Sequence, residues 1–131
     1  MAHDQITLTV PARGEYARTV RMTAAELGSR AAMTYDDIED VRMAAEEAFV
    51  YAVDTLPEGA DVRIVFTVAE DKLEIDVLLG TERASTSNED ERATAYASFI
   101  LEAVCDEVGF ASDDSGAHLH LLKCAGGVDA G

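Results

Sequence analysis

Two side chains at helical spacing, Glu47 and Tyr51, are the first candidates for chemistry in this sequence. They are four residues apart, so a helix would place both on one face, together with Ala44. A carboxylate in a cleft can act as a general base. This face is turned away from the apolar stripe of the predicted helix, however, and charge on an outer helix face is normally only solvated. The spacing alone therefore favours a solvated Glu47.

A pair of histidines, His118 and His120, is the second candidate. They are two apart in a predicted strand, so they face the same way, and two imidazoles could bind a metal ion. A third ligand would have to come from His3 or from the pair Asp113 and Asp114. Exposed strand histidines are the commoner case, so we expect no metal site.

Other chemical signatures are missing from the sequence. Neither GxxxxGK[ST] nor GxGxxG occurs, so no phosphate-binding loop is indicated. No Ser/His/Asp or Cys/His arrangement has supporting context. Cys105 and Cys124 have no zinc-type spacing, and we interpret both as buried, reduced thiols of a cytoplasmic protein.

The composition narrows the classes of partner. The 131 residues carry 26 Asp plus Glu against 10 Lys plus Arg, a net charge of −16, and 48% are apolar. Such acidity disfavours binding to nucleic acid or to anionic lipid, and it favours a protein partner with a basic patch. We find no run of 18 apolar residues, so we expect no membrane span. The N-terminal residues also lack the pattern of a signal peptide.

The hydrophobic periodicity predicts eight elements that would position these residues. In chain order they are a strand, two helices, two strands, a helix and two strands, at residues 6–10, 15–31, 34–56, 62–68, 73–79, 88–104, 108–111 and 118–123. In the third helix we expect a core face of Tyr96, Phe99, Ile100, Ala103 and Val104, and Asn88 with Glu91 resembles a capping signal. This order predicts an α+β fold, a two-layer sandwich with three helices on one face of a mixed or antiparallel sheet. We expect a single domain, residues 1–131, with a frayed tail at 125–131.

Three stretches resemble a known family in the right order: residues 11–18, 35–48 and 99–108. The chain is similar to the anti-sigma-factor serine kinases, a branch of the histidine-kinase-like ATPase superfamily. The likeness extends over residues 6–124. It implies that fold, ATP and Mg²⁺ as cofactors, and sequestration of a sigma factor that an anti-anti-sigma protein relieves.

The nucleotide motifs of that family are altered here. Glu47 keeps the position of the family's general base, but Tyr51 replaces the Asn that holds Mg²⁺, and a phenol is a poor ligand for that ion. Leu79, followed by Gly80, stands where the family has the Asp that accepts the adenine amino group. With the alignment shifted by one or two residues, Asp76 would be the candidate instead. We therefore treat Tyr51, Leu79 and Gly80 as degenerate nucleotide-site positions.

The segment that would hold the phosphates is altered as well. Only about ten residues join Leu79 to the third helix, which opens without the family's glycines and with three acidic residues at 89–91. Carboxylates there would repel a polyphosphate. We expect ATP binding to be weak or absent, no cofactor, and Glu47 to be unused as a base.

The family's partner-binding motif is kept. Tyr16, Ala17 and Arg18 match its aromatic-Ala-Arg stretch, and Arg21 follows one turn later. The resemblance implies that Tyr16, Arg18 and Arg21 contact the sigma factor and its antagonist, although exposed arginines also simply balance local acid. We thus expect a sigma-factor-binding regulator without kinase activity. An active serine kinase is the alternative, and a module with another ligand, or only a homodimer, is a third possibility.

Overall fold

The computed structural model describes residues 3–80, 88–114 and 116–126. All eight predicted elements are present, at bounds close to those expected, together with one short 3-10 helix. The elements in chain order are β1 (Asp4–Pro11), η1 (Gly14–Tyr16), α1 (Ala17–Ser29), α2 (Tyr35–Thr55), β2 (Asp61–Val68), β3 (Lys72–Gly80), α3 (Asn88–Val104), β4 (Glu107–Asp113) and β5 (Gly116–Cys124).

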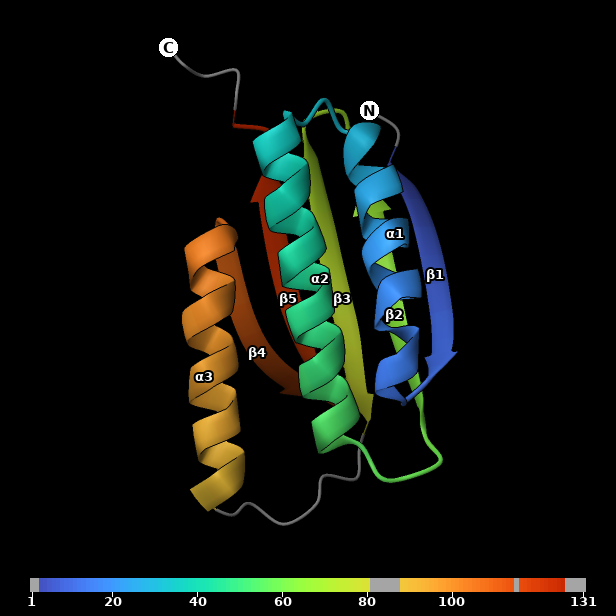
Figure 1. Cartoon of the computed structure of the whole chain (residues 1–131), viewed down its shortest axis with the longest axis vertical. Coiled ribbons are helices and arrows are strands. Elements are labelled where there is room, and N and C mark those ends of the chain that lie inside the picture. Colours follow the sequence, from blue (N-terminus) through green and yellow to red (C-terminus); the bar gives the residue numbers. More distant parts are fainter. Residues whose placement is uncertain (1–2, 81–87, 115, 127–131) are drawn as a thin grey trace.

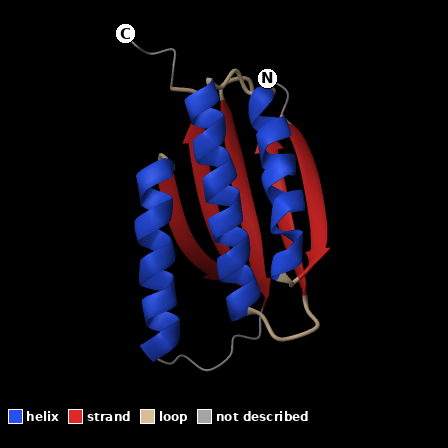
Figure 2. Cartoon of the chain, viewed as in Figure 1, coloured by secondary structure: helices blue, strands red, loops and turns tan. Residues whose placement is uncertain are grey.

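The five strands form one sheet in the order β1-β2-β3-β5-β4, and every neighbouring pair is antiparallel. The three helices lie side by side on one face of this sheet, with α2 between α1 and α3 (Figures 1 and 2). This arrangement confirms the predicted two-layer α+β fold. In the part of the chain that the structure describes, no helix is long and apolar enough to span a membrane.

The core lies between the helices and the sheet. The sheet contributes to it through strands in which buried and less buried residues alternate. In β2 and β3 every second residue is buried, so one face of each strand meets the helices and the other does not. The helices contribute small and aromatic side chains, among them Ala45, Ala48 and Phe49 of α2, which are at most 2% exposed. This close fit fixes α2 against the sheet.

Helix α2 has well-defined ends. The Thr34 hydroxyl accepts a hydrogen bond from the Asp37 amide, and the Asp37 carboxylate accepts one from the Thr34 amide, both at 3.1 Å. This capping box satisfies two free amides at the N-terminus. The helix ends at Thr55, two residues before Pro57. This is expected because a proline has no backbone amide and interrupts a helix.

The predicted core face of α3 is wrong in part. Tyr96 and Phe99 point into solvent, whereas Ala97 and Leu101 are fully buried and Val104 is half-buried. The sequence favoured the face with the larger side chains. Because α3 covers the edge of the sheet, only a narrow face with one large side chain, Leu101, meets the core. The side chains of residues 88–91, including the proposed capping pair, lie outside the described residues.

The end of the chain is held in place at its first two residues past β5. The amide of Ala125 donates to the Asp71 carbonyl at 2.8 Å, and the amide of Gly126 donates to the Asp37 carboxylate at 3.1 Å. Ala125 and Gly126 are therefore both hydrogen-bonded to residues outside β5. The frayed tail at 125–131 stays a prediction. Residues 127–131 lie outside the described residues.

Candidate functional site

The residue at the centre of the candidate site is Tyr51 of α2, whose side chain extends towards α3. Its side chain is 4% exposed. The hydroxyl shares a 2.8 Å hydrogen bond with the Thr94 hydroxyl of α3, and the ring meets Phe110 of β4 edge-on, with the ring centroids 5.5 Å apart. Tyr51 therefore joins three elements and occupies the space between them.

A cavity of about 190 Å³ lies next to this contact, at the ends of β3 and β5. Its lining residues are Leu79, Phe110, Ala111, Ser112, Ala117 and His118. Leu79 is buried, and Gly80 follows it with φ +78°, a backbone conformation that favours glycine. Leu79 and Phe110 thus line the same cavity, and Phe110 also contacts Tyr51.

Glu47 lies one turn before Tyr51 on the same helix and is half-buried. Burial raises the pKa of its carboxyl, and the nearby charges of Glu46 and Asp54 add to this shift. The expectation of a solvated outer face is wrong here, because Ala44 and Tyr51 on this face are buried. The face packs towards α3, whose position could not be inferred from the spacing within α2.

Asp76, the alternative adenine ligand, lies outside this site. It alternates along β3 with the buried residues Ile75 and Val77, so it is on the sheet face away from the helices. There the Nδ1 atom of His120 lies 2.7 Å from the Asp76 carboxylate. Asp76 is therefore separated by the sheet from the buried side chain of Leu79.

The two histidines of the predicted pair, His118 and His120, have different neighbours. His120 lies between Asp76 and Glu74, with its Nε2 atom 3.7 Å from the Glu74 carboxylate, whereas His118 lines the cavity near Leu79. Within residues 3–80, 88–114 and 116–126, no group of three His, Cys, Asp or Glu side chains could hold a metal ion.

The candidate partner-binding residues of α1 and η1 differ in their surroundings. Tyr16 is half-buried and interacts with Arg13, whose guanidinium donates to its hydroxyl at 3.2 Å. Arg21 donates to Glu46 of α2 at 2.9 Å, so its charge is partly compensated within the chain. Arg18 is exposed at the start of α1. It is the most accessible of the candidates.

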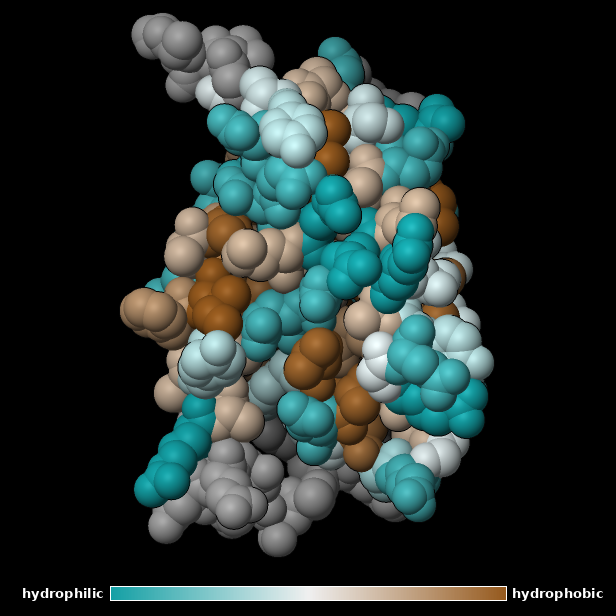
Figure 3. All heavy atoms as spheres, viewed as in Figure 1, coloured by the Kyte–Doolittle hydropathy of each residue, from teal (hydrophilic) through white to brown (hydrophobic). Residues whose placement is uncertain are grey.

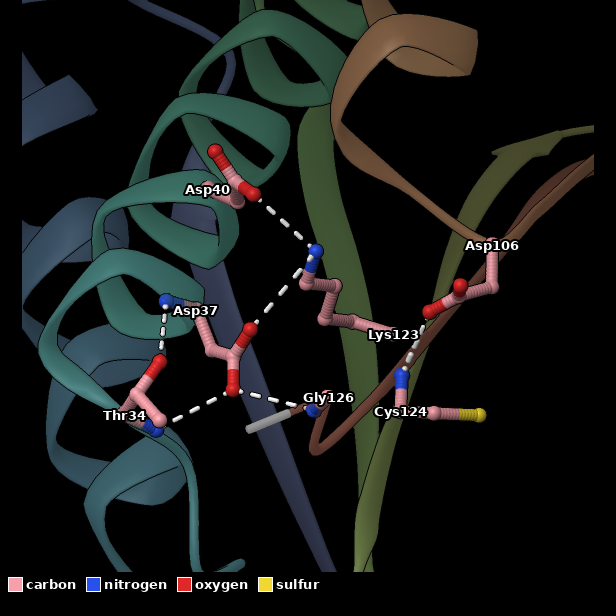
Figure 4. Close-up of polar contacts among 7 residues, drawn as sticks. All are labelled: Thr34, Asp37, Asp40, Asp106, Lys123, Cys124 and Gly126. Carbon is pink, nitrogen blue, oxygen red and sulfur yellow. Dashed lines mark hydrogen bonds and ion pairs between the residues drawn. The ribbon is translucent and has the colours of Figure 1, made fainter. Parts of the chain in front are cut away.

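A polar cluster at the N-terminal end of α2 was not anticipated from the sequence (Figure 4). Asp37, only 8% exposed, accepts hydrogen bonds from the amides of Thr34 and Gly126. The Lys123 ammonium of β5 lies 3.0 Å from Asp40 and 4.0 Å from Asp37. The spacing of Thr34 and Asp37 is a recognisable capping signal, but nothing local connects either residue with Lys123.

This cluster shifts the pKa values of its own groups. Burial opposes ionisation of Asp37, but the hydrogen bonds from Thr34 and Gly126 and the charge of Lys123 outweigh it, so its pKa is lowered. Burial likewise opposes the charge of Lys123, and the Asp40 carboxylate outweighs it and raises its pKa. The cluster is therefore a mutually satisfied ion network that fastens β5 to α2.

The two cysteines are not equivalent. Cys105 is half-buried, and burial raises the pKa of its thiol to about 12. Cys124 is exposed. The prediction of two buried thiols is correct only in part for Cys105 and wrong for Cys124, which ends β5 at the molecular surface.

The antiparallel sheet with its single layer of three helices defines an α+β domain of the histidine-kinase-like ATPase type. No family model matches the chain. It is 31% identical over 135 residues to the serine-protein kinase RsbW of Halalkalibacterium halodurans, covering 92% of this chain and 83% of that protein. It is 33% identical over 138 residues to the RsbW of Staphylococcus aureus strain Newman, covering 92% and 86%.

A third relative, the RsbW of Listeria monocytogenes serotype 4a, is 29% identical over 129 residues, covering 86% of this chain and 82% of that protein. The chain therefore belongs to the RsbW family of serine-protein kinases, the anti-sigma-factor kinases that its sequence resembles.

Proposed function

We propose that this protein is an anti-sigma-factor regulator that binds a sigma factor, an anti-anti-sigma protein, or both, and that it neither binds ATP nor transfers phosphate. The buried position of Tyr51 is the observation that carries the proposal. Its phenol stands where the family has a Mg²⁺-binding Asn, and its side chain fills the space between α2 and α3. A phenol is a poor substitute for the carboxylate, phosphate and water oxygens that Mg²⁺ prefers.

The adenine side of the site also supports the proposal. Leu79, which stands at the position of the family's adenine-binding Asp, is buried and has an aliphatic side chain. It cannot accept a hydrogen bond from an adenine amino group, and an unpaired buried donor costs about 1–3 kcal/mol. Asp76 cannot replace it from the other face of the sheet. The sequence between Leu79 and Val108 contains one glycine, Gly80, so a glycine-rich phosphate loop is missing as well.

Calorimetric titration with Mg-ATP tests the loss of nucleotide binding. We expect no sub-millimolar binding to the wild type. Tyr51→Asn restores the family's amide at this position and serves as the comparison, with circular dichroism to confirm that it folds. Sub-millimolar binding by the wild type, reduced by Leu79→Arg in the same site, would refute the proposal.

An active serine kinase is the second candidate, and the position of Glu47 favours it. Glu47 occupies the family's general-base position and is half-buried one turn from Tyr51, where a base would have to lie. Radiolabelled ATP with a candidate anti-anti-sigma protein distinguishes the two functions. A kinase would label that protein on serine and lose this activity in Glu47→Ala, with Glu46→Ala as the neighbouring control.

The partner surface that we propose is centred on Arg18. Its guanidinium is exposed at the beginning of α1, next to the half-buried Tyr16 of the family's aromatic-Ala-Arg stretch. Arg21 is one turn further along and already interacts with Glu46, so we assign it a supporting role. The net charge of −16 also favours a partner with a basic segment and makes association sensitive to salt.

Binding assays with sigma factors of the source organism test this surface. Arg18→Ala should weaken binding at least tenfold, because a charge at the centre of an interface is a frequent hot spot. Arg30→Ala is the matched control: Arg30 is also exposed, directly after the far end of α1, and pairs with Glu26. Equal binding by both variants would remove Arg18 from the interface.

A further inference from the structure

The sheet face away from the helices carries a polar cluster that the proposed regulatory function does not use. On this face, His120 of β5 lies between two carboxylates of β3, those of Asp76 and Glu74. Leu119 and Leu121, on either side of His120, are buried against the helices, so the imidazole is directed away from them. The helices form the surface seen in Figure 3, and the cluster lies on the opposite side of the sheet.

The contact with Asp76 assigns the proton of the imidazole. Nδ1 of His120 lies 2.7 Å from the Asp76 carboxylate, and because a carboxylate can only accept a hydrogen bond, Nδ1 donates. In the neutral imidazole the other nitrogen, Nε2, then carries a lone pair. Histidines that bind metal ions usually have such a carboxylate at the second nitrogen, where it orients the ring and makes it a better ligand.

The free nitrogen of His120 faces a second electron-pair donor. Nε2 lies 3.7 Å from a carboxylate oxygen of Glu74, which is too far for a hydrogen bond. Zn²⁺ binds imidazole nitrogen and carboxylate oxygen at about 2.0–2.2 Å. An ion at about 2.1 Å from both atoms would meet them at an angle of about 120°, which is compatible with the tetrahedral geometry of zinc sites. The separation of the two atoms therefore suits a shared metal ion.

The surroundings of this pair are open and acidic. The side chains of His120 and Glu74 are 30% and 33% exposed, so an ion can reach them from solvent. On β4, the residue opposite His120 in the register is Gly109, where even an added Cβ would meet nothing within 4 Å. The exposed Glu107, two residues before Gly109 on the same face, adds a further negative charge. The imidazole is thus bordered by carboxylates on both neighbouring strands.

We propose that Nε2 of His120 and the carboxylate of Glu74 bind one divalent transition-metal ion such as Zn²⁺. Asp76 is not a ligand in this site; it holds the imidazole in position through Nδ1. With two protein ligands the site differs from groups of three side chains, of which the described residues contain none. Water completes the coordination, so binding is weaker than in a structural zinc site with four protein ligands. Mg²⁺ and Ca²⁺ do not compete, because they prefer oxygen ligands.

The site is independent of the proposed regulatory function. The sheet separates it from Tyr51 and Leu79, whose side chains are buried on the helix side, and Arg18 lies in the helix layer. The ion joins β3 to β5, which are neighbours in the sheet, and it stabilises the folded chain according to its occupancy. Loss of metal binding would leave the sigma-factor proposal unchanged, and the reverse also holds.

Calorimetric titration of the full chain with zinc chloride alone tests the site. The background is Cys124→Ser, which removes an exposed thiol that could compete for the metal. We expect sub-millimolar binding of one ion per chain, and none with magnesium chloride. His120→Ala should abolish binding, and Glu74→Gln should weaken it at least tenfold. His118→Ala is the matched control, since it removes the other histidine of β5 and should leave binding unchanged.

Asp76→Asn tests the positioning role. It should weaken zinc binding about 10–100-fold, whereas circular dichroism and the urea midpoint without metal verify that each variant folds. Long-range proton–nitrogen NMR correlations should show that zinc shifts Nε2 of His120 and leaves Nδ1 protonated. The absence of sub-millimolar binding, binding that survives His120→Ala, binding that His118→Ala removes, or a zinc-bound Nδ1 would each overturn the proposal.

Discussion

The two ends of α2 differ in whether they stabilise charged side chains. At the N-terminal end, the carboxylates of Asp37 and Asp40 are held by backbone amides and by Lys123 (Figure 4). Further along the helix, Tyr51 presents a neutral hydroxyl that makes one hydrogen bond, and Glu47 beside it has a raised pKa. The N-terminal region stabilises ionised carboxylates, whereas the region around Tyr51 disfavours the ionised form of Glu47.

The difference comes from what each region is packed against. A buried charge is costly unless it is paired and hydrogen-bonded. The strand β5 supplies an ammonium to the first region, so its charges are compensated without any ligand. The second region lies against Thr94 and Phe110, which offer a hydroxyl and an aromatic ring. The first region therefore has a structural role. In the second region, the side chain of Tyr51 occupies the space between the elements.

The largest expected effect is the loss of the carboxylate at the centre of the first region. Asp37→Ala removes the carboxylate half of the capping box and leaves the amides of Thr34 and Gly126 without their acceptor. We expect the free energy of unfolding to fall by about 2–3 kcal/mol, measured by urea denaturation at pH 7. Asp36→Ala is the matched control in the same turn; Asp36 is exposed, and its loss should cost less than about 1 kcal/mol. Equal effects would contradict the assignment of Asp37 as the anchor of this region.

The pH dependence of stability reports on the same carboxylate. Because the pKa of Asp37 is lower in the folded chain than in the unfolded one, its contribution is present above the unfolded value of about 3.9. That contribution is lost as the pH falls through the folded value. We expect the urea midpoint to fall less between pH 6 and about pH 2 in Asp37→Asn than in the wild type. Parallel curves would mean that Asp37 does not carry this dependence.

Loss of the hydrogen bond between Tyr51 and Thr94 should have an intermediate effect on stability. Tyr51→Phe removes one hydroxyl and should lower the free energy of unfolding by about 1 kcal/mol. Thr94→Val removes the other half of the same hydrogen bond, so the double variant should cost less than the sum of the two. Tyr96→Phe, at an exposed position of α3, is the control and should be neutral. Additive losses would show that Tyr51 and Thr94 are not coupled.

The smallest expected effect distinguishes two adjacent carboxylates. Burial and neighbouring charges raise the pKa of Glu47 in the folded chain, so its ionised form opposes folding at neutral pH. Glu47→Gln should therefore stabilise slightly at pH 7, by up to about 0.5 kcal/mol, and the gain should vanish in acid. Glu46→Gln should have the opposite sign, because Glu46 pairs with Arg21 at 2.9 Å. Denaturation of both variants at pH 7 and pH 4 would reveal any departure from these signs.

The elements themselves could be predicted because their signals are local. Alternation in β2 and β3 and the capping pair of Thr34 and Asp37 depend only on neighbouring residues. The family resemblance depended on short stretches in a fixed order, and it is confirmed. The core face of α3 was wrong because periodicity reports which residues share a face, and it does not report which face the sheet covers.

The candidate site shows the same limit. Its types of side chain, Glu47, Tyr51 and Leu79, were apparent in the sequence, and the roles proposed for them remain predictions. Their surroundings were not apparent, because Thr94 and Phe110 are more than 40 residues from Tyr51 and reach it only when α3 and β4 close over α2.

The sequence by itself determined the order of the elements and the family, since both follow from residue type and short-range spacing. Only the tertiary structure decided that Tyr51 is enclosed, that Asp76 lies on the far face of the sheet and that Lys123 completes the cluster of Asp37 and Asp40. These depend on strand pairing and helix packing, which bring together residues far apart in the chain. Burial and charge compensation are properties of that assembly.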